Sequence, residues 1–524
     1  MARILIFHGY LLAGTGSNVY NARLAQTLAR LGHEVHLLCQ ERHPERLGFV
    51  DAAGDWDSGA LRVRRLREPG GSGSCTVYRP DIGGLLPVYV PDRYEAVEAR
   101  TFAELSEEEL RRYLRANVEA VLEVADRAAP ELALANHLVM GPVILARALG
   151  GTTPYAVKVH GSALEYTVKP EPERFLGLAR EGLAPAAAVL VGSRHTAESL
   201  WEAIADPGLP SRTRLGPPGV DVARFRPRDR RTALAEMADL ARALQRTPRL
   251  SGESSAFARD PRRAGEALAR LASTDPLVAF VGKLIVSKGP DLLLAAWPLV
   301  LERLPRARLL IVGFGAYREG LEVLVRALRA GDLEGVRELA LEGRALEGPG
   351  DGARADPLTY LLAFLDGLDG AAAARYLAAA GTLGERVVFS GRLEHEELTL
   401  VLPACDALVV PSTFPEAFGM VAAEAAACGV LPISAAHSGL AEVSEALAER
   451  VPAPVRPLLS FELGPEAVPA IAGRLLDWLE CSPATREGTR EALVATVCER
   501  WSWESVADSV IAAARGELEG LPEP

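Results

Sequence analysis

Two glutamates stand eight positions apart near the C-terminal end of the sequence. Glu416 lies in a Pro-rich turn, and Glu424 lies in an Ala-rich stretch that favours a helix. The apolar run 407–410 before the turn is typical of a buried parallel strand. The amides of Phe418 to Val421 would then lie at the start of the helix, where anions and sugar hydroxyls bind. A carboxylate beside such amides can hold both parts of a sugar phosphate.

Each glutamate taken alone has a purely structural explanation. A Glu at a helix start is usually a favourable charge on the helix dipole, and a Glu one or two turns later is usually solvated. The pair indicates a ligand site only together with the residues that could accompany it.

Two lysines five positions apart could supply charge to the same ligand. Lys283 follows the apolar run 277–281 and Gly282, and Lys288 precedes Gly289. Lysines in a cleft loop can neutralise a diphosphate leaving group as point charges. Surface lysines are usually only solvated, so their position beside a glycine after a buried strand is what favours this role.

A glycine-containing loop follows the first predicted strand. Gly14, Thr15 and Gly16 precede a predicted helix whose first amides could meet a ligand. The loop is not a dinucleotide fingerprint, because Val19 occupies the place of the third glycine. A tight turn that needs glycine for its backbone explains the loop equally well.

Histidines end two of the predicted strands in the first half of the chain. His160 follows the run 155–159, where it could polarise or orient a substrate. His137, after Asn136, ends the preceding strand in the same manner. The alternative for both is a structural histidine that hydrogen-bonds a neighbouring loop.

Length, charge and cysteine content limit the class of protein. A chain of 524 residues is too long for one ordinary core, and a net charge of −12 argues against a general nucleic-acid binder. Six dispersed cysteines without a CxxC pair predict reduced thiols and a cytoplasmic location. The sequence contains no run of 18 uncharged apolar residues, so we predict no membrane span. Peripheral contact with the inner membrane face is left open.

Two charged motifs are explained without a functional role. The basic run from Arg62 to Arg67 is best explained as a solvated strand edge. Asp55-Trp56-Asp57 resembles a metal-binding pair, but it precedes a strand instead of following one. We therefore expect no obligatory metal and no cofactor.

Short apolar runs alternate with helical segments, which predicts an α/β protein with parallel sheets and right-handed crossovers. Residues 206–219, with several prolines and glycines, indicate a connection between two doubly wound, Rossmann-like domains that face each other across a cleft. We place the first domain at residues 1–216 and the second at 217–499. Expected strands cover 4–7, 34–39, 61–66, 132–135, 155–159 and 188–191 in the first domain, and 277–281, 307–312, 386–390 and 407–410 in the second.

Two segments of the second domain exceed what such a domain needs. Residues 228–275 and 317–385 are rich in Ala, Leu, Arg and Glu with helical periodicity, so we predict helical insertions. The Gly-rich break at 347–352 is interpreted as a mobile loop within the second insertion.

The order of these motifs resembles that of the large family 4 of retaining glycosyltransferases, which have the GT-B fold. The resemblance covers nearly all of the chain except the insertions, and its most specific part is the Glu-x7-Glu motif of Glu416 and Glu424 with Phe418-Gly419. The other matching segments are 14–16 with 24–25 and 32–35, 160–161, 218–221 with 225–227, 282–283 with 288–289, 311–315, 388–391 and 439–443.

The resemblance implies that domain 1–216, with helix 500–524 packed back on it, is on the acceptor side, and that domain 217–499 binds the donor. It also implies a role for each matching residue. Glu416 would hold hydroxyls of the donor sugar, Glu424 the nucleotide ribose, and Lys283 and Lys288 the diphosphate. His160 would lie near the anomeric carbon. Further donor contacts would come from the first loop, the helix start and the base pocket: Gly14, Thr15, Gly16, Gly282, Phe418, Gly419, Met420, Val421, Arg392 and Leu393.

Three features depart from the family pattern. The family more often has Arg at the position of Lys283, and Lys keeps the charge but loses the planar fork. Thr15 separates glycines that are often paired. The insertions are unusually long and could shape acceptor access or assembly.

We therefore expect a metal-independent hexosyltransferase that moves a sugar from a UDP-, GDP- or ADP-sugar to a hydroxyl of a small molecule, lipid or glycan, with retention at the anomeric carbon. One alternative is a nucleotide-sugar epimerase of similar two-domain fold, which would need further carboxylates or histidines facing the sugar. The other is a non-catalytic nucleotide-sugar-binding scaffold. The sequence does not distinguish donor bases, donor sugars or acceptors.

Overall fold

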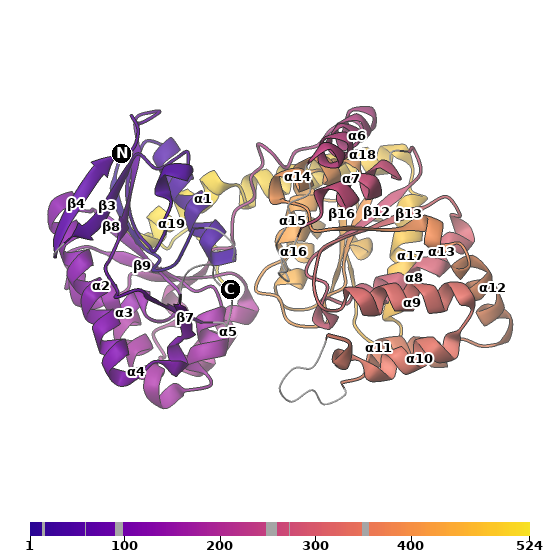
Figure 1. Ribbon diagram of the computed structural model, residues 1–524, viewed down its shortest axis with the longest axis horizontal. Coiled ribbons are helices and arrows are strands. Elements are labelled where there is room, and N and C mark those ends of the chain that lie inside the picture. The colour runs from indigo at the N-terminus through magenta and orange to yellow at the C-terminus, as the bar shows by residue number, and fades with distance from the viewer. Residues whose placement is uncertain (13–15, 58, 90–97, 248–258, 272, 348–355) are drawn as a thin grey trace. The chain divides into compact units, whose positions relative to one another are not determined.

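The computed structural model describes residues 1–12, 16–57, 59–89, 98–247, 259–271, 273–347 and 356–524. The chain divides into two compact units (Figure 1). Unit 1 comprises Met1–Gly219 and Trp501–Pro524, and unit 2 comprises Val220–Arg500. Each unit is built around its own sheet.

Unit 1 contains a nine-stranded sheet with the order β11-β10-β9-β8-β1-β2-β5-β3-β4. All neighbours pair in parallel except β3 and β4. A separate parallel pair is formed by β6 (Leu85–Val88) and β7 (Glu98–Thr101). The strands of the large sheet are β1 (Arg3–Phe7), β2 (Glu34–Leu38), β3 (Ala52–Asp57), β4 (Ala60–Arg65), β5 (Ser74–Arg79), β8 (Leu132–Asn136), β9 (Tyr155–Lys158), β10 (Ala188–Val191) and β11 (Thr213–Leu215).

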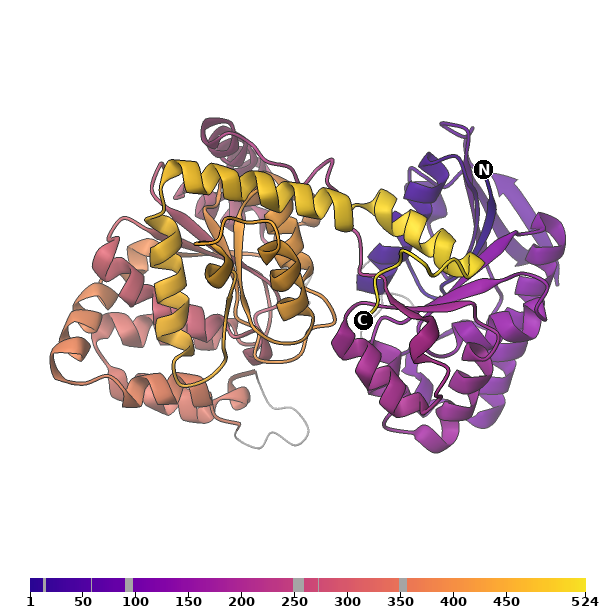
Figure 2. The same ribbon diagram turned by 180° about the vertical axis from the view of Figure 1, so that it is seen from behind.

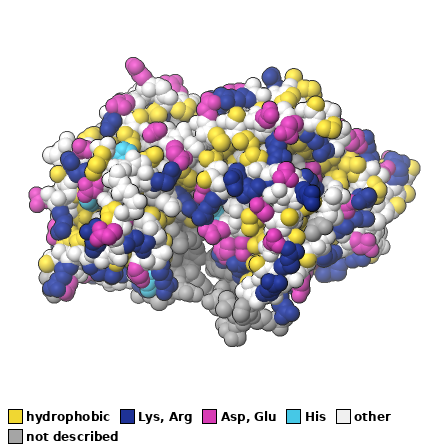
Figure 3. Space-filling model, turned by 90° about the horizontal axis from the view of Figure 1, so that it is seen from above, with side chains coloured by type: hydrophobic (Ala, Val, Ile, Leu, Met, Phe, Trp, Pro, Cys, Tyr) yellow, Lys and Arg dark blue, Asp and Glu magenta, His cyan; other side chains and the backbone are white. Residues whose placement is uncertain are grey.

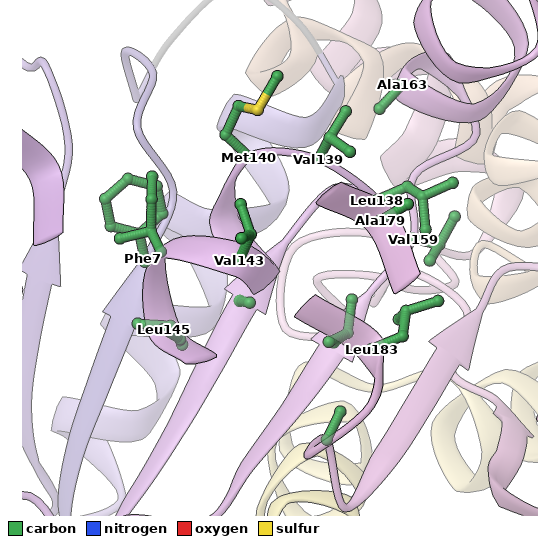
Figure 4. Close-up of a cluster of buried hydrophobic side chains, with 14 of the residues drawn as sticks. Phe7, Leu138, Val139, Met140, Val143, Leu145, Val159, Ala163, Ala179 and Leu183 are labelled. Atoms are coloured by element: carbon green, nitrogen blue, oxygen red, sulfur yellow. The ribbon is translucent and has the colours of Figure 1, made fainter. Parts of the chain in front are cut away.

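Helices cover both faces of this sheet, because alternate residues of its central strands are apolar on both sides. Leu5 and Phe7 of β1 belong to the core on one face, while Ile4 and Ile6 belong to the core on the other. Figure 4 shows part of the first core, around Phe7, and Figure 2 shows the C-terminal helix α19 on unit 1. The helices are α2 (Glu107–Ala128), α3 (Gly141–Leu149), α4 (Pro172–Leu183) and α5 (Arg194–Ile204) on the first face, and α1 (Gly16–Arg30) and α19 (Trp503–Arg515) on the second.

Unit 2 contains a six-stranded sheet with the order β14-β13-β12-β15-β16-β17, parallel throughout. Its strands are β12 (Leu277–Val281), β13 (Arg308–Val312), β14 (Val387–Gly391), β15 (Ala407–Val410), β16 (Leu431–Ala435) and β17 (Ser460–Phe461). The helices between and around them are α8 (Pro290–Arg303), α14 (His395–Val401), α15 (Met420–Ala427), α16 (Ser438–Ala448), α17 (Ala467–Leu479) and α18 (Pro483–Arg500).

The two predicted insertions are helical. The first contains α6 (Arg230–Arg246) and α7 (Pro261–Ala269). The second contains α9 (Arg318–Ala330), α10 (Leu333–Glu342), α11 (Thr359–Asp366), α12 (Gly370–Ala380) and the short α13 (Leu383–Arg386). Apart from Glu347, the Gly-rich break at 347–352 lies outside the described residues.

The predicted strands are confirmed to within a few residues, with one correction of direction. The strand expected at 61–66 is β4, which runs antiparallel to β3 at the edge of the sheet. Only residues 58 and 59 separate β3 from β4, and a parallel pair needs a crossover of a dozen residues or more. The basic run therefore lies on an edge strand, with Arg62, Arg64 and Arg65 exposed, as the sequence predicted.

The sequence missed several strands. β11 lies within the segment predicted as a connection, because Thr213–Leu215 pairs with β10 between flanking prolines. β16 carries Pro432 in its middle, which normally argues against a strand inside a sheet. β5 follows the Gly/Ser-rich run 70–74, which is typical of a loop.

The second insertion packs against α8 through Tyr376. Pro298 lies inside α8 and interrupts its ladder of backbone hydrogen bonds. The buried Tyr376 hydroxyl donates to the carbonyl oxygen of Ala295, in the disrupted turn, at 2.9 Å. Tyr376 thus connects α12 to the turn of α8 that precedes Pro298 through one buried hydrogen bond.

Tyr376→Phe should lower the free energy of unfolding of unit 2 by about 1 kcal/mol, because it removes one buried hydrogen bond and keeps the ring. Urea unfolding measures the change. Tyr360→Phe on α11 is the matched control, since its hydroxyl makes no hydrogen bond within the described residues. Equal stability of Tyr376→Phe and the wild type would contradict this account.

Candidate active site

Glu416 is held by three loops of unit 2. Its Oε1 accepts hydrogen bonds from Lys288 Nζ, with which it forms an ion pair, and from Ser412 Oγ at 2.8 Å. Its amide donates to Ser438 Oγ at 2.9 Å, and its carbonyl oxygen accepts from the amide of Gly439 at 3.0 Å. The carboxylate therefore has a fixed position after β15, while about a fifth of the side chain stays exposed.

Lys288 reaches Glu416 because the loops after β12 and β15 are in direct contact. The two strands are neighbours in the sheet, so their C-terminal ends lie side by side. Gly289 has φ +63°, and a Cβ atom there would lie 2.0 Å from the carbonyl oxygen of Pro411, so only glycine fits. Ser412 Oγ and the amide of Thr413 also donate to the carbonyl oxygen of Ser287, at 3.0 and 2.9 Å.

Lys283 lies in the same loop after β12 and is exposed. Within the described part of the chain it makes neither a hydrogen bond nor an ion pair. Gly282 before it continues the sheet, since its amide donates to the carbonyl oxygen of Val312 at 3.1 Å. The Lys283 charge is thus free to meet a ligand, whereas that of Lys288 is shared with Glu416.

The helix after Glu416 begins at Met420, with Gly419 as its N-cap residue. The first backbone bond of the helix runs from the amide of Ala423 to Gly419, at 3.0 Å. The amides of Met420 and Val421 therefore lie in the first turn, where the helix itself supplies no acceptor. Phe418 and Gly419 precede the helix, so the predicted anion-binding turn begins two residues later than Phe418.

Glu424 lies one turn further along α15 and is 5% exposed. Its Oε1 is 2.6 Å from Nε2 of His395, the first residue of α14, whose ring packs against Phe225 at 4.9 Å. The sequence analysis did not single out His395, Ser412 or Ser438. His395 and Ser438 lie more than 20 positions from the glutamates that they contact, and Ser412 lies four positions before Glu416 in the same loop. No local pattern marks any of the three.

Arg392 and Leu393 follow β14, which is separated from β15 by β13 and β12. The Arg392 guanidinium lies 5.6 Å from the centre of the Phe314 ring and 3.4 Å from a Glu394 oxygen. Leu393 is buried. Their role at a nucleotide base stays a prediction.

In unit 1, His160 belongs to a buried network of histidine and asparagine side chains. Its Nε2 donates to Asn136 Oδ1 at 2.9 Å, and Asn21 donates to the same oxygen at 3.0 Å. Asn21 also contacts His8 Nδ1 at 3.0 Å, and His8 Nε2 lies 3.0 Å from Asn18 Oδ1. The ends of β1, β8 and β9 and the start of α1 supply these groups, and the sequence analysis missed His8, Asn18 and Asn21.

The histidines of this network are neutral. Burial lowers the pKa of His8 to about 4, and burial with the neighbouring His137, Lys158 and His8 holds the pKa of His160 well below its usual range. Burial lowers the pKa of His137 in the same way. With its proton on Nε2, His160 has Nδ1 as its acceptor nitrogen, so it can orient a hydroxyl but is not a cation.

His137 is the least satisfied member of this group. It is 2% exposed, has φ +68°, and neither ring nitrogen has a hydrogen-bond partner in the described structure. Its ring centre lies 4.4 Å from that of Tyr89 and 4.9 Å from that of His160. Burial of these nitrogens destabilises the folded state, because they lose their hydrogen bonds to water and gain none within the described structure.

The predicted first loop is only partly described. Gly14 and Thr15 lie outside the described residues, and Gly16 is the exposed first residue of α1. A Cβ atom on Gly16 would have no neighbour within 4 Å, so the described surroundings do not require glycine there.

The described residues contain no group of three or more His, Cys, Asp or Glu side chains arranged to hold a metal. Asp55 forms an ion pair with Arg79 at 2.8 Å, and Asp57 lies 3.3 Å from Arg62. All six cysteines are free thiols. No described helix combines the length and apolarity of a membrane span. On the face shown in Figure 3, lysines and arginines are interspersed with acidic residues.

Two family models match this chain. "Glycosyl transferase 4-like domain" covers residues 15–208, and "Glycosyl transferases group 1" covers residues 360–451, which include Glu416 and Glu424. The chain belongs to the family 4 glycosyltransferases. The family resemblance of the sequence is thereby confirmed.

Curated glycosyltransferases are similar over part of this family 4 chain. D-inositol 3-phosphate glycosyltransferase of Segniliparus rotundus is 28% identical over 59% of the chain and 48% of its own length. A GDP-mannose-dependent monoacylated alpha-(1-6)-phosphatidylinositol monomannoside mannosyltransferase of Corynebacterium glutamicum is 26% identical over 45% of the chain and 46% of its own length. The chain thus spans about half the length of the curated relatives it matches.

Solved structures show the GT-B fold expected of a family 4 glycosyltransferase. Sucrose-phosphate synthase from Thermosynechococcus elongatus has a TM-score of 0.52 at 20% identity, covering 99% of this chain and 100% of that one. Anabaena HepE in complex with UDP has a TM-score of 0.54 at 14% identity, covering 98% and 100%.

Unit 1 should lose stability as the pH falls from about 6.5 towards 4. A histidine whose pKa is lowered by folding binds fewer protons in the native than in the unfolded state across that window, so the free energy of unfolding falls by up to about 1.4 kcal/mol per pH unit for each. Above about pH 6.5 both states are neutral and this contribution is constant.

His137→Asn tests this account, because Asn tolerates the left-handed backbone and does not titrate. Between pH 7 and 5 the free energy of urea unfolding should fall less in this variant than in the wild type, by about 1–2 kcal/mol. The exposed His43→Asn is the matched control and should keep the wild-type dependence. Identical pH dependence in all three proteins would contradict the assignment.

Proposed function

We propose that this protein transfers a sugar from a nucleoside diphosphate sugar to an acceptor hydroxyl, with retention of the anomeric configuration and without a metal ion. The arrangement of Lys288, Ser412 and Glu416 against the start of α15 carries the proposal. It offers a fixed carboxylate for sugar hydroxyls beside a cation and helix amides for phosphate oxygens.

The donor diphosphate would meet Lys283, Lys288 and the amides of Met420 and Val421. Lys283 lacks an ion pair among the described residues, and Lys288 is already within reach of the Glu416 carboxylate. Because Lys288 shares its charge with Glu416, the two lysines need the helix amides beside them to stabilise the two negative charges of the diphosphate ester.

Glu416 and Glu424 would bind different parts of the donor. Glu416 would accept hydrogen bonds from sugar hydroxyls while Ser412 and Lys288 keep its other contacts. Glu424 would accept a hydrogen bond from the nucleotide ribose. His395 contacts Oε1 of Glu424 and would orient this carboxylate. The carboxylates therefore serve as binding groups, and neither is assigned as an acid, a base or a nucleophile.

In the reaction we propose, the bond between the anomeric carbon and the diphosphate oxygen breaks while the acceptor oxygen attacks from the same face. The proton of the acceptor hydroxyl passes to a phosphate oxygen of the leaving group, so no protein base is required. His160 would orient a hydroxyl near the anomeric carbon through its Nδ1, because its Nε2 hydrogen is donated to Asn136.

The donor nucleotide is the open point of this proposal. HepE was solved with UDP, and the Corynebacterium glutamicum relative is GDP-mannose-dependent. Calorimetry with UDP-, GDP- and ADP-sugars would identify the base, and product analysis with alcohol, inositol and lipid acceptors would identify the acceptor class.

Glu416→Gln should lower kcat for transfer by at least about 100-fold, because the amide cannot accept the same hydrogen bonds or pair with Lys288. Steady-state kinetics with the donor found by calorimetry measure the effect, and circular dichroism checks the fold. Glu462→Gln, on an exposed part of unit 2, is the matched control. Near-normal turnover of Glu416→Gln would refute the site assignment.

The product should carry the anomeric configuration of the donor, and EDTA should leave the initial rate unchanged. Proton NMR of the first product, recorded before mutarotation, reports the configuration. An inverted product would refute the proposed same-face attack, and loss of activity in EDTA that Mg²⁺ restores would refute metal independence.

A further inference from the structure

Both chain segments that lead from unit 1 to unit 2 are attached to one group of side chains within unit 1. The first segment is 216–219, and the second begins at Trp501. The group consists of Lys158 on β9, Tyr20 on α1 and Trp503 on α19. All of these residues belong to unit 1, and the Tyr20 ring contacts His160.

Lys158 holds the first segment. Its side chain is 2% exposed, and its Nζ donates to the carbonyl oxygen of Gly216 at 2.5 Å. Val157 in β9 and Val159 directly after the strand belong to the core on the opposite face, so alternation turns Lys158 towards α1 and α19. Its Nζ lies 5.7 Å from the centre of the Tyr20 ring.

Trp503 holds the same segment from the other side. A Cβ atom on Gly219 would lie 2.5 Å from Cδ2 of Trp503, so the indole packs directly on the Gly219 backbone. Trp503 is the first residue of α19 and belongs to the second segment, so it connects the two segments. Its ring centre lies 5.5 Å from that of Tyr20.

Tyr20 joins this group to His160. The two rings meet edge to face, with centres 5.1 Å apart and an interplanar angle of 75°. Tyr20 is 3% exposed, and its hydroxyl has no hydrogen-bond partner among the described residues. A buried hydroxyl without a partner destabilises the fold, so the ring contacts are what this side chain contributes.

We infer that Tyr20 is a positioning residue that couples the orientation of His160 to the two segments between the units. Asn136 fixes the His160 ring through its Nε2, and the Tyr20 ring limits its rotation from the other direction. A displacement of Gly216, Gly219 or Trp503 changes the environment of Tyr20 and thereby the direction of His160 Nδ1. This inference rests on the proposed function for its catalytic meaning, but its structural coupling can be tested without activity.

The kinetic test compares variants of Tyr20 with a variant of the same core. Tyr20→Phe keeps the ring and should keep kcat within about twofold. Tyr20→Leu should lower kcat at least about tenfold while KM for the donor changes less than about threefold. Leu28→Ala, on the same face of α1 and in the same core, is the matched control and should keep kcat.

A double-mutant cycle tests the coupling to the segments. Trp503→Leu should lower kcat in the wild type but produce little further loss in Tyr20→Leu, because both act on His160 through the Tyr20 ring. If the losses of kcat in Tyr20→Leu and Trp503→Leu multiply in the double variant, the inference is overturned. Equal losses of kcat in Tyr20→Leu and Leu28→Ala would also overturn it. If Trp503→Leu does not fold, Trp503→Phe, which shortens the side chain that packs on Gly219, takes its place in the cycle.

NMR of ring-labelled histidine gives a readout that needs no substrate. The His160 resonances, assigned with His160→Asn, should move in Tyr20→Leu and in Trp503→Leu and stay in place in Leu28→Ala. Unmoved resonances in Tyr20→Leu would overturn the inference. If no donor supports transfer but the resonances move as expected, the proposed function fails while the coupling stands.

Discussion

The contact between the loops after β12 and β15 is the constraint on which the candidate donor site depends. Glycine at position 289 allows the backbone to approach Pro411, and this approach brings Lys288 to Glu416. The contact exists because the two strands are neighbours in a parallel sheet, although more than 120 residues separate Lys288 from Glu416. A side chain at position 289 would separate the cation from the carboxylate.

Unit 1 also holds polar side chains in fixed positions at strand ends, but these side chains are neutral instead of charged. The ends of β1, β8 and β9 hold histidines and asparagines that bond to one another, and burial keeps the histidines uncharged. His137 has no partner within the described residues, so the cluster is less stable than an apolar packing of the same volume would be. The two units thus present different chemistry: a paired, partly exposed charge in unit 2, and neutral, oriented donors and acceptors in unit 1.

The helical insertions show how an addition to a sheet domain is accommodated without changing its site. α12 packs on α8, and the hydroxyl of Tyr376 donates to the carbonyl oxygen of Ala295 in the turn before Pro298. α8 begins directly after Gly289, so the insertion contacts the helix that supports the Lys288 loop. Lys283, Lys288 and Glu416 lie in the loops after β12 and β15, and Glu424 lies in α15.

The sequence by itself determined the fold class, the family, and the positions of Glu416, Glu424, Lys283, Lys288 and His160 at strand ends or helix starts. These follow from short apolar runs, glycines and residue spacing, which are local properties of the chain. The antiparallel edge strand β4 and the Pro-containing β16 were misjudged or missed, because pairing with distant strands outweighed the local signals.

Only the tertiary structure decided which residues contact these groups. His395, Ser438, Asn21 and Asn136 reach their partners through sheet order and helix packing, and their polar side chains are too common to mark a site in a sequence. The same is true of Tyr20 and Trp503, which the sequence places nearly 500 positions apart and the fold brings into ring contact beside His160. Spacing along a chain reports local geometry, whereas these contacts depend on the order of the strands in the sheet and on the packing of the helices against it.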